Sequence, residues 1–167
     1  VEDAVVINNG TDVTSPEGIP AHQFLSSVLG GTNEEIAQII WKNTPQGIAS
    51  YGTITETVTD DQGFLQDVKF TRPSDVDIYF KVDITINTTE FPGSGEDDIK
   101  NAIVAYGVAN FKISDDSIRS EFYTPINTVS GITSNDHYIA LTPSPSGTSN
   151  IAIDVDEISR YDTARVE

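Results

Sequence analysis

The segment Gly30–Pro73 constrains the fold most, because it contains a capped helix, a stop and a hairpin in one uninterrupted run. Thr32 and Glu35 have the T-x-x-E spacing of a capping box, which starts a helix. Pro45 ends that helix, since the residue before a proline is pushed out of the helical region. The apolar residues between them are Ile36, Ile39, Ile40 and Trp41. Their spacing predicts an amphipathic helix with one buried stripe.

The same segment predicts a two-stranded hairpin after the helix. A turn is expected around Tyr51, which lies between two glycines. Residues 53–58 and 64–70 read as strands, and Asp61-Gln62-Gly63 supplies the turn between them. Pro73 follows the second strand and is predicted to mark the boundary between two lobes.

The rest of the chain shows the same two periodicities. Asp75–Ile86 is the longest run of alternating apolar residues, which predicts a strand with one buried side. A second helix is expected from Ser94 or Gly95, where Glu96, Asp97 and Asp98 suit the positive end of the helix dipole. The other expected elements are strands at Val5–Ile7 and His22–Leu29, a helix at Ser117–Ile126, and strands at Ile132–Leu141, Ile151–Val155 and from Tyr161 to the end.

These elements predict an α+β protein of two small lobes. Each lobe is expected to have a mostly antiparallel sheet with one or two amphipathic helices packed on it. Residues 1–72 would form the first lobe, with strand, strand, helix and hairpin. Residues 73–167 would form the second, with strand, helix, helix and strands.

Composition limits how such a fold is stabilised. The chain has 167 residues, of which 37% are hydrophobic, and a chain of this length buries roughly 70% of its unfolded surface. It contains no cysteine, so disulfides, thiolate nucleophiles and most structural zinc sites are excluded. It also lacks methionine, and we expect it to be a piece of a longer polypeptide. The chain has no run of about 18 apolar residues, so no membrane span is predicted.

The strongly acidic character narrows the possible partners. The formal net charge is −17, from 26 acidic and 9 basic residues. This charge repels nucleic-acid phosphates and anionic lipid surfaces. We therefore predict that the chain binds no nucleic acid and that anionic lipid surfaces are disfavoured. The acidity is compatible with solubility alone, or with a surface that faces a basic partner or divalent cations.

The sequence offers no combination of residues that points to catalysis. His22 and His137 are far apart and neither has metal-ligand spacing. The acidic candidates for a metal site are Asp60-Asp61, Asp75 with Asp77, Glu96-Asp97-Asp98, Asp115-Asp116, and Asp154 with Asp156 and Glu157. None matches the calcium loop of EF-hands, and no nucleophile elbow or phosphate-binding glycine loop is present. We therefore predict no enzyme activity and assign no catalytic, cofactor-binding or metal residue, no cofactor and no small-molecule substrate.

Trp41 keeps a second class of function open. Tryptophan and tyrosine side chains can stack on sugar rings, which would suit a carbohydrate-binding module. Because Trp41 lies beside the apolar stripe of the predicted helix, a place in the core or in an interface is the alternative.

Several short motifs occur in an order that resembles a known family. They are Gly30-Gly31, Glu34–Trp41, Pro45-Gln46-Gly47-Ile48, Tyr51-Gly52, Val68–Pro73, Phe91-Pro92, Ser120–Ile126 and Val129–Ile132. Their order and spacing resemble the baseplate J-like family of contractile-tailed bacteriophages, which includes the Mu-like baseplate wedge component. Members carry a further N-terminal region that precedes the part seen here.

The resemblance implies a structural role in a virion. A family member would be a wedge subunit of the tail baseplate, assembled in the bacterial host cytoplasm. Its partners would be other wedge and hub proteins and copies of itself in a ring. Prophages and contractile injection systems have similar proteins. The alternative is a carbohydrate-binding or adhesin module of a phage tail.

Overall fold

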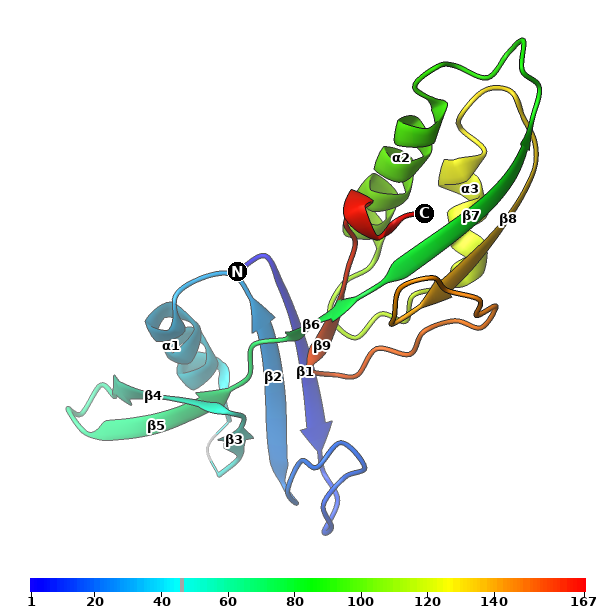
Figure 1. The fold of residues 1–167 in the computed structure, drawn as a ribbon. Helices are drawn as coiled ribbons and strands as arrows, with labels where there is room; N and C mark the ends of the chain where they lie inside the picture. Colours follow the sequence, from blue (N-terminus) through cyan, green and yellow to red (C-terminus); the bar gives the residue numbers. More distant parts are fainter. Residues whose placement is uncertain (46) are drawn as a thin grey trace. The chain divides into compact units, whose positions relative to one another are not determined.

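The computed structural model describes residues 1–45 and 47–167, and the chain divides into two compact units (Figure 1). Unit 1 comprises residues 1–74 and 155–157, and unit 2 comprises residues 75–154 and 158–167. The expected α+β class is confirmed, because helices and small, mostly antiparallel sheets occur together. The division after residue 74 lies close to the predicted lobe boundary, but unit 1 also takes in residues 155–157.

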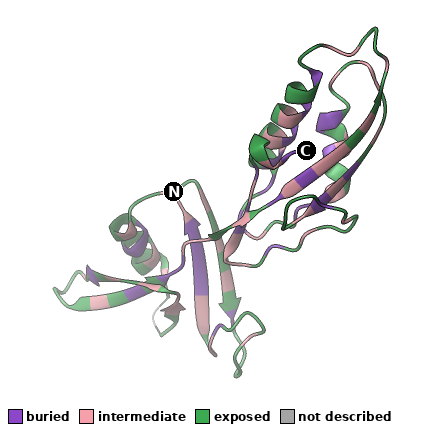
Figure 2. Ribbon diagram, viewed as in Figure 1, coloured by how far each residue is buried: buried purple, intermediate pink, exposed green. Residues whose placement is uncertain are grey.

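Unit 1 contains a three-stranded sheet in the order β1-β2-β3. Its strands are β1 (Asp3–Asn9), β2 (Gln23–Leu29) and β3 (Ala49–Tyr51). β1 and β2 are antiparallel, whereas β2 and β3 are parallel. β2 is buried from Leu25 to Val28, while β1 alternates between half-buried and exposed residues until the buried Asn9 (Figure 2). The turn expected at Tyr51 is therefore wrong, because Tyr51 pairs with Leu25 in a strand.

The predicted capping box is present at the start of α1 (Asn33–Asn43). The Glu35 N–H donates to Thr32 Oγ1 at 3.3 Å, and the Thr32 N–H donates to Glu35 Oε2 at 3.1 Å. The buried side of α1 consists of Ile36 and Ala37. Ile39 is 54% exposed, so the predicted stripe is too wide. The motif Pro45-Gln46-Gly47-Ile48 includes Gln46, which lies outside the described residues.

The hairpin is confirmed as β4 (Ile54–Thr59) and β5 (Leu65–Phe70), which are antiparallel. The core of unit 1 lies between this hairpin, β2 and α1. Its buried members are Val28, Ile36, Ala37, Val58, Val68 and Phe70. Apolar contact between these three elements thus takes the place of covalent cross-links, as the absence of cysteine requires.

Arg72 ties the end of β5 to the turn before α1. Its guanidinium donates to the carbonyl oxygens of Val28, Gly30 and Gly31 and to Asn33 Oδ1, at 2.7–3.1 Å. Gly30 and Gly31 have φ angles of 71° and 76°, a region that favours glycine. This backbone conformation turns both glycine carbonyls within reach of one side chain.

Two further pairs of strands lie in unit 2, except for Ser74 and Glu157, which begin two of these strands and belong to unit 1. The pairs are β6 (Ser74–Asp77) with β9 (Glu157–Arg160), and β7 (Tyr79–Ile86) with β8 (Ile132–Ala140). The single strand expected over Asp75–Ile86 is therefore divided at Ile78. The division follows from pairing, because the two pieces have different partners. Ile78 and Phe80 are buried as the alternation predicts, whereas Ile86 at its end is exposed.

The helices of unit 2 surround an aromatic core. They are α2 (Gly95–Asn110), the 3-10 helix η1 (Arg119–Phe122), α3 (Tyr123–Ile126) and the 3-10 helix η2 (Thr163–Arg165). Phe122 is fully buried and contacts the rings of Phe80, Phe111 and Tyr161. α2 approaches this core closely, because a Cβ on Gly107 would lie 2.5 Å from the Tyr161 ring.

The helix expected at Ser117–Ile126 is present over residues 119–126, as η1 followed directly by α3. Two other predictions for the second half are wrong. The strand expected at Ile151–Val155 is reduced to one bridge, between Ile151 and Ser117. Within the described part of the chain, the backbone N–H of Ile153 bonds the Asp116 carboxylate and no backbone carbonyl of a neighbouring strand. The end from Tyr161 is η2 and one bridge from Val166 to Phe80, while the strand β9 was not predicted.

We expect Arg72→Lys to destabilise unit 1, because an ammonium group cannot reach four acceptors held in a guanidinium geometry. Hydrogen bonds to charged groups contribute about 1.5–3 kcal/mol each, so a loss of about 3 kcal/mol in the free energy of unfolding is expected. Urea unfolding monitored through Trp41, the single tryptophan, measures this. The substitution retains the charge, so an unchanged midpoint would contradict the role assigned to the hydrogen bonds.

Candidate functional site

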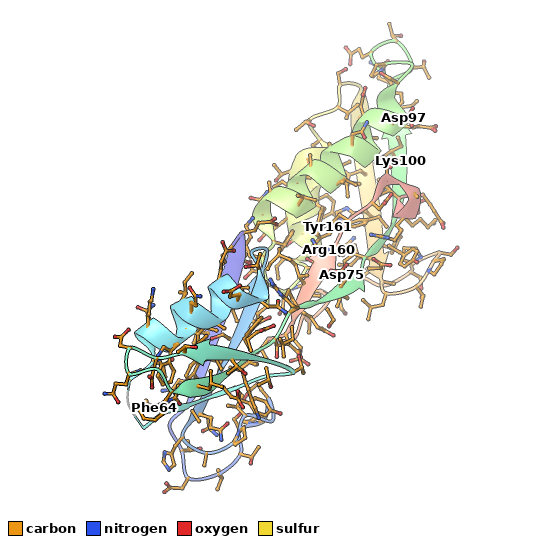
Figure 3. All side chains as sticks on the ribbon, turned by 90° about the vertical axis from the view of Figure 1, so that its left-hand side faces the viewer. Phe64, Asp75, Asp97, Lys100, Arg160 and Tyr161 are labelled. Atoms are coloured by element: carbon orange, nitrogen blue, oxygen red, sulfur yellow. The ribbon has the colours of Figure 1, made fainter. Side chains whose placement is uncertain are left out.

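The acidic residues considered for a metal site mostly serve local structure. Asp60 accepts hydrogen bonds from the Gln62 and Phe64 N–H groups and from Gln66 Nε2, which lower the pKa of Asp60, the Gln66 bond most. Asp75 forms an ion pair with Arg160 at 2.6 Å (Figure 3).

The other acids are similarly placed. Asp77 pairs with Arg165, Asp98 accepts from Ser94, Asp115 accepts from the Lys112 N–H, and Asp116 accepts from the Ile153 N–H. Glu96, Asp97 and Asp98 lie in the first turn of α2, as predicted. Asp154 and Asp156 do not lie on one strand face, because β9 begins only at Glu157. Among residues 1–45 and 47–167, no group of three or more acidic or histidine side chains could hold a metal ion.

The two histidines occupy unlike positions in separate units. His22 has a φ of 57° and contacts Asp12 on the surface of unit 1. His137 is fully buried on β8 in unit 2. Its Nε2 lies 2.8 Å from the Arg119 carbonyl oxygen. Because a carbonyl only accepts, Nε2 carries the proton, and Nδ1 is buried without a partner among the described residues.

A polar network holds η1 against β8 around His137. Arg119 donates from Nε to the His137 carbonyl oxygen and pairs with Asp136. The Tyr123 ring meets the His137 ring edge to face, with centroids 4.4 Å apart. Burial lowers the pKa of His137, because the charged imidazolium would lose its contact with water. Desolvation alone would raise the pKa of Asp136, but hydrogen bonds from Tyr138, the His137 N–H and Tyr123 lower it. These contacts join η1 to β8.

A surface hollow of about 1080 Å³ lies between α1 and the β4–β5 hairpin of unit 1. Trp41 lines it, and also lines a second hollow of about 310 Å³ beside β3. Trp41 is 38% exposed, so it is neither a core residue nor a fully exposed one. Polar side chains form most of the remaining wall of the larger hollow, among them Glu34, Gln38, Lys42, Glu56, Gln62 and Gln66. This hollow can offer an indole surface together with amide and carboxylate groups.

The tip of the β4–β5 hairpin carries the most exposed apolar pair of unit 1. Phe64 and Leu65 are 63% and 73% exposed, and Phe64 lies at the periphery of the unit (Figure 3). They follow the turn at Gly63 directly. The sequence analysis places Phe64 in the predicted strand of residues 64–70. Two consecutive apolar residues cannot both point inward from a strand. That adjacency was the signal for an exposed contact point.

Comparison with known proteins gives no assignment, because no family model matches the chain and no curated protein matches it. Among the described residues, no helix combines the length and the apolar content needed to cross a membrane.

We expect unit 2 to lose stability as the pH falls below about 6.5, the ordinary pKa of histidine. The unfolded chain takes up a proton there, whereas buried His137 does not, so each further pH unit lowers the free energy of unfolding by up to about 1.4 kcal/mol until the folded pKa is reached. A nuclear magnetic resonance titration of the imidazole protons measures the folded value directly. The His137→Gln variant identifies the His137 signal, and a midpoint at or above 6.5 would refute the expectation.

Proposed function

We propose that this chain is part of a structural wedge subunit of a contractile phage tail baseplate. The proposal starts from the ordered motifs between Gly30 and Ile132. It is supported by the contact between the first and the last motif of the Gly30–Pro73 segment. Arg72 binds the Gly30-Gly31 turn, and Trp41 and the hairpin lie between these two motifs in the sequence. Such motifs maintain a shape, which is the requirement of an assembly part.

The observation that carries the proposal is the exposed apolar tip at Phe64 and Leu65. Contiguous exposed apolar surface marks sites of contact with other proteins, and Phe64 and Leu65 adjoin at the end of the hairpin. Aromatic side chains are also enriched among the residues that dominate binding energy in interfaces. The tip would insert into a neighbouring wedge or hub protein in the assembled virion. This role requires complementary surfaces and no chemical turnover.

The double variant Phe64→Ser, Leu65→Ser tests this role in the full-length protein with its baseplate neighbours. We expect the loss of about 2–4 kcal/mol of binding free energy, seen by native mass measurement of the complexes. Val108→Ser is the matched control, because Val108 on α2 is 62% exposed and apolar but lies in unit 2. Complexes of unchanged stability in the double variant would count against the tip, and the absence of any complex with wild-type protein would count against the proposed function.

A second candidate, a carbohydrate-binding module, rests on the hollow beside Trp41. An indole next to amide and carboxylate groups is able to stack on a sugar ring and bond its hydroxyls. A glycan array probed with wild-type protein and with Trp41→Ala separates the two candidates. Binding that disappears in the variant would favour the second, and a blank array with both proteins would remove it.

A further inference from the structure

We propose that the outer edge of β1 is an interface for a second copy of this chain, which pairs with it as an antiparallel strand about a twofold axis at Val6. The inference deepens the proposed assembly role by naming one partner. It is tested on the chain alone, so its failure leaves the test of the hairpin tip intact.

The direction of the β1 backbone groups follows from the hydrogen bonds of β2. Val28 N–H donates to the Thr71 carbonyl oxygen at 2.9 Å, and Thr71 N–H donates to the Ser26 carbonyl oxygen at 2.9 Å. The backbone N–H and C=O groups of Ser26 and Val28 therefore point away from β1. Their partners in the register, Val6 and Ala4, form non-hydrogen-bonded pairs with them.

The backbone N–H and C=O groups of Ala4, Val6 and Asn8 consequently point away from the sheet. The order β1-β2-β3 makes β1 an edge strand. Among the described residues, none of these six groups bonds another backbone group, and the Ala4 N–H is held only by its neighbour Asp3, at 2.9 Å. Val6 is 63% exposed. An edge with open backbone groups is a template for another strand.

The sequence of β1 suits a second copy. In an antiparallel register centred on Val6, Val6 faces Val6 of the other copy, and Ala4 faces Asn8. All three outward residues of each strand are then paired, and the two three-stranded sheets become continuous. A twofold interface of this kind uses the same patch on both copies and closes on itself.

The charges at this edge favour the antiparallel arrangement. Glu2 and Asp3 lie at the beginning of β1, and Asn9 and Gly10 at its end. In the proposed register each acid faces an uncharged residue of the other copy. A parallel arrangement would instead place the acids of the two copies side by side, where like charges destabilise the pair.

The net charge of −17 acts against association at long range. Salt screens this repulsion, with a Debye length of about 10 Å at 0.1 M. Dimerisation through β1 is thus expected to strengthen as salt is raised. An extended basic segment bound at the same edge would show the opposite salt dependence.

Single cysteines test the register, because the chain has none of its own. With a short bis-methanethiosulfonate cross-linker, Val6→Cys is expected to give a covalent dimer, since the two Cα atoms would lie about 5.5 Å apart. Asn8→Cys is the matched control on the same strand face. Its two copies would be four residues apart along the strands, about 13 Å, and little dimer is expected.

The Val6→Pro variant tests the hydrogen bonds without disturbing unit 1. Proline removes the outward N–H of Val6 but no bond to β2, and edge strands tolerate it there. Sedimentation at about 0.5 M salt should show the loss of the wild-type dimer, with unchanged Trp41 fluorescence as the check on folding. Equal cross-linking at positions 6 and 8, no cross-linking at position 6, or a dimer that survives Val6→Pro would each overturn the inference.

Discussion

Unit 1 depends on the interaction between the Arg72 guanidinium and the carbonyl oxygens of the Gly30-Gly31 turn. β2 ends, α1 begins and β5 ends at this point, and the guanidinium bonds the Val28 and Gly30 carbonyl oxygens and Asn33 Oδ1. A cation is stabilised by carbonyl dipoles that converge on it, and here the left-handed glycines make the carbonyls converge. The apolar contacts among Val28, Ile36 and Phe70 then fill the space that this joint defines.

Unit 2 is organised around an aromatic core. Phe122 lies among the rings of Phe80, Phe111 and Tyr161, and Gly107 lets α2 come close enough to cover them. The polar network of Arg119 and His137 fastens the short helices to β8 beside this core. The acidic residues contribute in the same local way, as turn caps and ion-pair partners. The structure therefore explains many of the carboxylates individually, while their sum leaves a strongly negative surface.

Several elements could be predicted from signals that lie within a single segment of the sequence. The capping box at Thr32, the hairpin turn at Gly63 and the alternation after Asp75 depend on neighbours in sequence, and each is present. The division at Ile78, the strand β9 and the parallel pairing of Tyr51 depend on partners distant in sequence. No periodicity encodes such a choice of partner. For the same reason the convergence on Arg72 and the open edge at Val6 required coordinates, although the adjacent Phe64 and Leu65 were visible as a conflict with strand alternation.

The interleaving of the two units bears on how the polypeptide acquires its structure during translation. Unit 1 takes in residues 155–157, and the Asp156 carbonyl oxygen accepts the Ser74 N–H at 2.8 Å. A ribosome delivers Asp156 only after almost all of unit 2 has been synthesised. The segment made first therefore cannot complete its backbone bonding until the segment made later has emerged, and the maturation of the two units is linked in time.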